Sequence, residues 1–117
     1  MGELIGIARF RFHPGKVEDY KRLSAQAMDI VRTKESGTLE YAIYFNEDES
    51  EAVVIERFAS SEALLEHGAN MSEISPLVLE TGAVEGELLG EPNAELRALL
   101  TGPEPQLFTP WISLRPR

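Results

Sequence analysis

The chain has 117 residues, 43% of them hydrophobic and 26% charged, and this size and composition predict one globular domain instead of a disordered chain. The formal net charge of −9 disfavours nucleic acid as a partner, because affinity for a phosphate backbone depends on Lys and Arg. The absence of cysteine excludes disulfides, thiolate nucleophiles and cysteine-based metal sites, and it fits a reducing compartment.

No apolar run approaches the ~20 residues that a membrane-spanning helix needs. Residues 1–12 carry charges at Glu3, Arg9 and Arg11, where a signal sequence would have its apolar centre. We therefore expect a cytoplasmic protein that does not enter a membrane.

The first elements are a strand and a long helix. Hydrophobicity alternates over residues 4–12, as it does when the side chains of a strand point to opposite faces in turn. After the break at Pro14-Gly15, apolar residues within 17–34 recur at spacings of three and four, which places them on one face of an amphipathic helix. Gly37 ends this helix, because glycine adopts the left-handed conformation at a helix end at little cost.

Two further strands follow. Residues 39–45 and 52–58 are rich in β-branched and aromatic side chains and are separated by the acidic stretch 46–51, which predicts a β-hairpin. Apolar residues occur on both faces of these strands. A sheet covered on one side only would alternate more cleanly, so we expect the second face to meet a partner subunit or a ligand cavity.

The second half of the domain begins at a Ser-Ser step. Ser60 or Ser61 can cap a helix that runs to about residue 68, and a second helical segment at about 72–79 is interrupted or restarted by Pro76. A fourth strand is predicted at 83–89. The order β-α-β-β-α-β indicates an α+β, ferredoxin-like domain with an antiparallel sheet and both helices on one face.

We assign residues 1–92 to this domain and residues 93–117 to a C-terminal extension. Asn93 can cap a short helix, and a short strand is predicted at 106–109, followed by a tail. The extension is expected to belong to the same domain or to a dimer interface.

Two histidines are candidates for chemistry. His67 lies on the amphipathic helix, one turn after Leu64, where it could transfer a proton or contact a substrate; a structural or surface role is the alternative. His13 adjoins a turn and is interpreted as solvated. The spacing does not bring the two histidines together as a metal-binding pair, so we expect no metal site.

Three aromatic residues, Tyr41, Tyr44 and Phe58, could line a ligand pocket, although aromatic residues on central strands also serve as simple core. Arg9 and Arg11 share one strand face and need partners, for which acidic residues of neighbouring strands such as Glu56 are the favoured interpretation.

The usual marks of several enzyme classes are missing from the sequence. It contains no Gly-x-Ser-x-Gly, no phosphate-binding glycine loop and no dinucleotide fingerprint. These absences exclude nucleophile-elbow hydrolases, P-loop enzymes and Rossmann oxidoreductases in their usual form.

The element order and the stretch 56–67, Glu-Arg-Phe-Ala-Ser-Ser-Glu-Ala-Leu-Leu-Glu-His, resemble the antibiotic biosynthesis monooxygenase family. That family typically shows Glu-x-Trp-x-Ser, then Glu-Ala-Leu and a His, at this junction of strand and helix. Gly37 followed by Tyr41, and the acidic turn at 46–51, are also similar. The resemblance covers roughly residues 4–90.

This resemblance implies a homodimeric α/β barrel in which two sheets pack together and a pocket lies between each sheet and its helices. It also implies a cofactor-independent monooxygenase that oxidises a small aromatic quinol or anthrone with molecular oxygen, without metal or flavin. His67 corresponds to the family's helix histidine and is the expected catalytic residue, while Tyr41, Tyr44 and Phe58 are expected to bind the substrate.

One position departs from the family pattern. Phe58 stands where the family usually has Trp, which removes an indole N–H that could bind a phenolic oxygen. Two alternatives therefore stay open: a non-catalytic dimer of the same fold that binds a small molecule, and a protein that binds or degrades haem.

Overall fold

The computed structural model describes residues 2–114, so the last part of the predicted extension 93–117, residues 115–117, lies outside the described residues. In chain order the elements are β1 (Leu4–Phe12), α1 (Val17–Lys34), β2 (Thr38–Phe45), β3 (Glu51–Phe58), α2 (Ser61–Asn70), α3 (Ser75–Leu79), β4 (Gly82–Leu89), α4 (Ala94–Leu99) and β5 (Gln106–Phe108).

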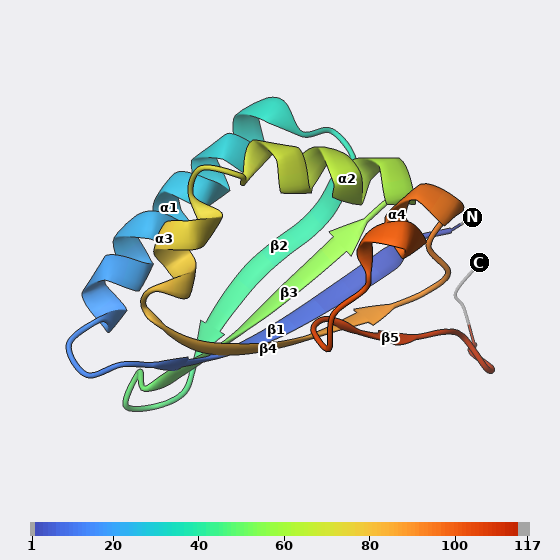
Figure 1. Ribbon diagram of the computed structural model, residues 1–117. Helices are drawn as coiled ribbons and strands as arrows, with labels where there is room; N and C mark the ends of the chain where they lie inside the picture. The colour runs from blue at the N-terminus through green and yellow to red at the C-terminus, as the bar shows by residue number, and fades with distance from the viewer. Residues whose placement is uncertain (1, 115–117) are drawn as a thin grey trace.

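The strands form one sheet in the order β2-β3-β1-β4-β5. β1 lies at its centre and pairs antiparallel with both β3 and β4, and β5 adds to β4 in parallel. Helices α1, α2 and α3 lie over the same face of the sheet, and α4 lies beside the start of α2 (Figure 1). This confirms the predicted ferredoxin-like α+β fold with an added C-terminal helix and strand.

The sequence of α1 explains its stability and its orientation. Its buried side chains recur on one face and pack on the sheet: Tyr20, Leu23, Ala27 and Val31. Acidic residues occupy its first turn and basic residues its last, so the charges oppose the helix dipole at both ends. The burial of this face fixes where the C-terminal end of α1 meets the start of β2.

The start of α2 is fixed by two serines. The side chain of Ser60 accepts a hydrogen bond from the backbone N–H of Ala63 at 3.1 Å, as an N-cap does. The hydroxyl of Ser61 accepts one from the backbone N–H of Asn93 at 2.9 Å, and Asn93 in turn caps α4. Ser60 therefore caps α2, and Ser61 joins the start of α2 to the start of α4. The following helix α3 begins only at Ser75, later than the segment predicted from about residue 72.

Small residues on the helix-facing side of the sheet leave room beneath α2. Gly6 and Ala8 of β1 lie beside Gly86 of β4, because the register pairs Ala8 with Gly86 and Gly6 with Glu56 of β3. A Cβ at Gly6 would lie 3.3 Å from Oε1 of Glu56. The small residues of the central strands thus leave space above the sheet for the carboxyl group of Glu56.

Gly37, in the loop after α1, lies directly against Ala63 of α2. A Cβ at Gly37 would lie 2.6 Å from the Cβ of Ala63, so Gly37→Ala forces α2 away from β2. We expect a loss of roughly 1–3 kcal/mol in the free energy of unfolding, as for other overpacked sites, measured by urea denaturation.

Gly68→Ala is the matched control, because a Cβ at Gly68 has nothing within 4 Å. It is expected to leave stability unchanged or raise it by up to about 1 kcal/mol, since Ala is the better helix former. Equal effects of the two substitutions would contradict this account of the Gly37 contact.

Candidate functional site

A buried carboxylate organises the end of α1. Glu35 directly follows α1, and only 1% of its side chain is exposed. Its Oε1 lies 3.0 Å from Nδ1 of His67 and accepts a hydrogen bond from the Thr38 hydroxyl at 2.6 Å. Its Oε2 accepts one from the Asn70 side chain at 3.0 Å. Residues of α2 and β2 therefore converge on one carboxylate at the end of α1.

These hydrogen bonds decide the ionisation of Glu35. Burial raises the pKa of the carboxyl, but the bonds from Thr38, Asn70 and His67 outweigh burial and hold that pKa below its ordinary value. An ionised carboxylate is only an acceptor, so Nδ1 of His67 carries the hydrogen of their bond. When the imidazole is neutral, its Nε2 is left with a lone pair that can accept a proton.

A second carboxyl group faces this nitrogen. Nε2 of His67 lies 3.8 Å from Oε2 of Glu56 on β3. Burial raises the pKa of Glu56; the proximity of His67 opposes this shift, and the charge of Glu35 adds to it. Glu56 therefore holds its proton to higher pH than an ordinary glutamate. Glu35, His67 and Glu56 form a row of carboxylate, imidazole and carboxyl, which we call the acid–base row.

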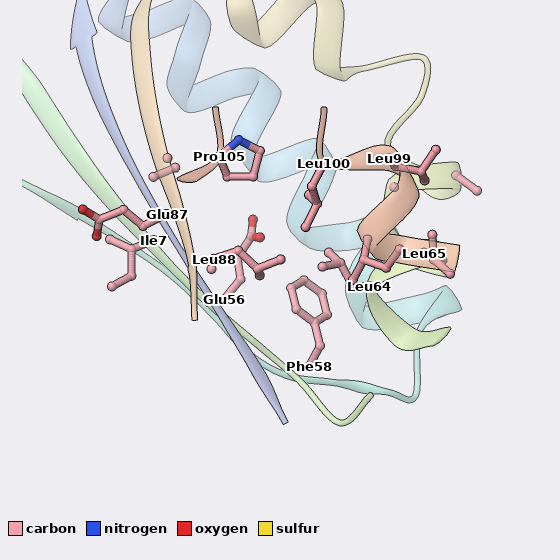
Figure 2. Close-up of a pocket in the computed structure, with 16 residues that line it drawn as sticks. Ile7, Glu56, Phe58, Leu64, Leu65, Glu87, Leu88, Leu99, Leu100 and Pro105 are labelled. Atoms are coloured by element: carbon pink, nitrogen blue, oxygen red, sulfur yellow. The ribbon is translucent and has the colours of Figure 1, made fainter. Parts of the chain in front are cut away.

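The acid–base row adjoins a large apolar cavity of about 420 Å³ between the sheet, α2 and α4. Figure 2 shows the Glu56 carboxyl among aliphatic side chains, with Phe58 beside it. The side chain of Glu56 is 25% exposed, and it lines this cavity. A carboxyl group that retains its proton is suited to such surroundings, because an apolar cavity disfavours a charge.

A second cavity, of about 220 Å³, lies between the sheet, α1 and α3. Its lining is more polar and includes Tyr20, Ser24, Tyr41 and His67. Glu56 lines both cavities. The acid–base row therefore stands where the two cavities meet.

Aromatic rings surround His67. The Tyr41 ring lies 5.7 Å from it, edge to face, and the Phe58 ring lies 5.2 Å from it. Burial raises the pKa of the Tyr41 phenol, and the charges of Glu56 and Glu35 add to this shift, so the phenol remains a neutral hydrogen-bond donor. Of the residues predicted to act together, the structure thus brings His67, Tyr41 and Phe58 to one place.

Tyr44 is not among them. It pairs with Val53 across the hairpin, on the face of the sheet opposite the helices, and it is 58% exposed. The reason is the alternation of β2: Tyr41 points toward His67, so a residue three positions later points the other way.

Glu56 was predicted to pair with Arg9 or Arg11, and this prediction is wrong. Arg9 and Arg11 point away from the helices, so Glu56 is not their partner; Arg11 instead lies 4.0 Å from Glu51. Glu56 and Glu35 were not identified as site residues. The parity of β3 was a usable signal for Glu56, which shares a face with the buried Phe58, whereas Glu35 carried no signal.

Within residues 2–114, no group of three or more His, Asp or Glu side chains is arranged to hold a metal ion. None of the helices in the described part of the chain is both long and apolar enough to cross a membrane.

Comparison with known proteins gives a family and several similar folds. The sequence profile of the family described as antibiotic biosynthesis monooxygenase matches residues 4–71, a range that contains the whole acid–base row. No curated protein matches the chain.

MupZ from Pseudomonas fluorescens has a TM-score of 0.80 at 21% identity, over 99% of this chain and 91% of that one. Rv0793 from Mycobacterium tuberculosis has a TM-score of 0.68 at 26% identity, over 78% of this chain and 96% of that one. A point variant of SnoaB, a cofactor-independent oxygenase from Streptomyces nogalater, has a TM-score of 0.67 at 15% identity, over 75% and 91%. The likeness to MupZ thus extends through the C-terminal helix and strand.

The two carboxyl groups should affect stability with opposite signs. The pKa of Glu56 is raised by folding, so its carboxylate destabilises the folded chain as pH rises above the unfolded value of about 4.3. We expect Glu56→Gln to stabilise by on the order of 1 kcal/mol at neutral pH. The pKa of Glu35 is lowered, so its contribution is present above the unfolded pKa and is lost as pH falls through the folded one. Glu35→Gln should cost about 2–4 kcal/mol at neutral pH.

Urea denaturation from about pH 3 to pH 7 measures both effects. Each variant should converge on the wild-type free energy of unfolding toward the acidic end. If both substitutions shifted stability in the same direction at neutral pH, the assigned ionisation states would be wrong.

Proposed function

Because the chain belongs to the antibiotic biosynthesis monooxygenase family, we propose that it is a cofactor-independent monooxygenase that oxidises a small aromatic quinol or anthrone with dioxygen. The observation that carries this proposal is the acid–base row between two cavities: His67 lines the one of about 220 Å³, and Glu56 lines both this one and the apolar one of about 420 Å³. Such a substrate supplies its own electrons once it has lost a proton, so the protein has to bind it, accept that proton and stabilise the anion.

His67 accepts the proton in this proposal. Glu35 fixes the ring with hydrogen on Nδ1, which leaves Nε2 as the base, and its negative charge stabilises the imidazolium that forms. This is the role of the carboxylate in an acid–base triad. The neighbouring rings of Tyr41 and Phe58 limit the orientations open to the imidazole.

Glu56 acts as a hydrogen-bond donor in its protonated form. Burial raises the pKa of Glu56, and the protonated carboxyl can donate to the oxygen on which the substrate's negative charge develops. This hydrogen bond adds to the stabilisation of the anion by the His67 imidazolium. Phe58 supplies an apolar wall where the family usually has Trp, so the donor to the substrate oxygen comes from Glu56 or the Tyr41 phenol.

The oxidation balances for an anthrone as R₂CH₂ + O₂ → R₂C=O + H₂O. The carbanion passes an electron to dioxygen, and the radical pair combines to form a carbon–oxygen bond and a peroxide. Loss of the second C–H proton then breaks the O–O bond, leaving one oxygen atom in the ketone and the other in water. His67 takes a proton in each deprotonation and returns it to the departing oxygen.

Oxygen consumption tests this proposal. Purified protein is expected to accelerate oxygen uptake with anthrone or a hydroquinone, and His67→Ala should lower kcat by about 10²–10⁴-fold through loss of the base. Glu56→Gln should lower it as well, since the amide is a weaker acid. Tyr44→Phe is the control, because Tyr44 lies on the other face of the sheet and should leave uptake unchanged.

The remaining outcomes separate the alternatives. Saturable binding of these compounds without uptake by wild type would identify a non-catalytic binding protein. A Soret band on adding haem that disappears in His67→Ala would assign a haem protein. No uptake with any compound and no effect of His67→Ala would end the monooxygenase proposal.

We further propose that the protein is a homodimer formed through the open face of the sheet. The helices leave this face uncovered (Figure 1), and β1 and β3 present Ile5, Ile7, Val53 and Ile55 on it. An apolar sheet face of this kind favours a second copy, since sheets pack face to face through such residues.

Light scattering at micromolar concentration is expected to give about twice the 13.0 kDa mass of one chain. Ile55→Lys places a charge on the open face and should yield monomers, whereas Ile55→Val keeps the face apolar and should not. A monomeric wild type would refute the dimer.

A further inference from the structure

The two cavities adjoin at Glu56 of the acid–base row. Glu56 and Ala8 line both of them, and the small side chain of Ala8 leaves space above the sheet where they adjoin. The volumes, about 420 and 220 Å³, together fall in the range of about 300–1,000 Å³ that pockets for organic ligands usually occupy. A compact quinol that reaches His67 would leave the larger cavity without an occupant.

We propose that the substrate is an elongated amphiphile, a hydroxylated aromatic ring with an aliphatic tail. The ring lies in the smaller cavity against the acid–base row, and the tail lies in the larger cavity beneath α4. This inference rests on the proposed function for the identity of the ring, and it adds the tail and the direction in which the molecule lies.

The smaller cavity has the chemistry for a polar ring. Its lining contains the hydroxyl groups of Tyr20, Tyr41 and Ser24 and the imidazole of His67. Burial raises the pKa of both phenols, so they are neutral and can donate or accept hydrogen bonds. Aromatic hydroxyl groups find partners here that an aliphatic chain could not use.

The larger cavity has the chemistry for a tail. Apart from Glu56, Glu87 and Phe58, its walls are aliphatic, with Leu64 and Leu65 from α2, Leu99 and Leu100 at the end of α4, and Pro105 (Figure 2). Leu99, which lines the cavity, is 65% exposed to solvent, although burying a leucine is favourable. An aliphatic tail would cover it.

The wall formed by α4 is attached firmly to the rest of the fold. Asn93 caps α4 and bonds to Ser61 at the start of α2, and Leu96 packs in the buried cluster with Leu4 and Leu88. The cavity is thus formed before any tail enters, which lowers the entropic cost of binding. This wall lies after residue 71, beyond the segment that matches the family, so the C-terminal extension supplies one wall of the tail site and α2 supplies another.

The test is calorimetric binding of alkyl hydroquinones in the absence of oxygen, with methyl, propyl, hexyl and octyl chains compared with hydroquinone itself. Affinity is expected to rise about fourfold per methylene group until the larger cavity is full. Gly68→Leu extends a side chain from the face of α2 that carries Leu64 and Leu65, and it should move the plateau to shorter chains. Gly68→Ala, which adds a single methyl group, should behave as wild type, and neither should change the affinity for hydroquinone.

Ser24→Leu fills the smaller cavity instead and should weaken every compound by a similar factor. Ala69→Leu is a second variant of the tail wall, in case Gly68→Leu fails to give a folded protein by circular dichroism. Affinity independent of chain length, or an unshifted plateau in both folded tail variants, would overturn the inference.

The outcome is independent of turnover, because binding is measured without oxygen. A rise in affinity with chain length in a protein that shows no oxygen uptake would support the amphiphile while removing the monooxygenase. Oxygen uptake with hydroquinone and no preference for a tail would do the opposite.

Discussion

The buried carboxylate of Glu35 is the constraint on which the rest of the site depends. It accepts hydrogen bonds from three side chains that belong to β2 and α2, and it lies at the end of α1, so three elements are held at their junction by one charge. A charge removed from water is stable only when its lone pairs are satisfied in this way. Its ionisation sets the tautomer of His67, and its field contributes to the raised pKa of Glu56. A substitution of Glu35 would therefore alter both the tautomer of His67 and the pKa of Glu56.

The hydrophobic periodicity of the sequence predicted the fold well, because each main element buries a continuous apolar face. The residues of α1 recur at helical spacing and those of β1 alternate, and both patterns follow from which side meets the core. The helical segment predicted at about 72–79 begins too early, because α3 starts only at Ser75. Pro76 lies in its first turn, where proline is well accepted. The parallel pairing of β5 with β4 has no local signature, because it depends on where α4 directs the chain.

The site was only partly predictable, for reasons that differ among its residues. His67 could be found because histidine is rare here and lies on an amphipathic helix. Glu56 could have been found by following the alternation of β3 inward to Phe58, but it was interpreted as an ion-pair partner of Arg9 and Arg11. The role of Glu35 depends on how the end of α1 meets α2 in three dimensions. The size of a cavity beneath α2 likewise depends on the pairing of small residues on separate strands, Ala8 and Gly86.

The strand β5 has a consequence for how copies of the chain can meet. A sheet edge with free N–H and C=O groups is a template on which another strand can add. Three residues of β5 cover this edge of β4, and the side chain of Glu104 accepts a hydrogen bond from the backbone N–H of Gly86 just before that pairing begins. β5 is now the edge on this side of the sheet, and its three residues offer another strand little to pair with. The C-terminal extension, which forms one wall of the larger cavity through α4, therefore also disfavours aggregation through the sheet edge.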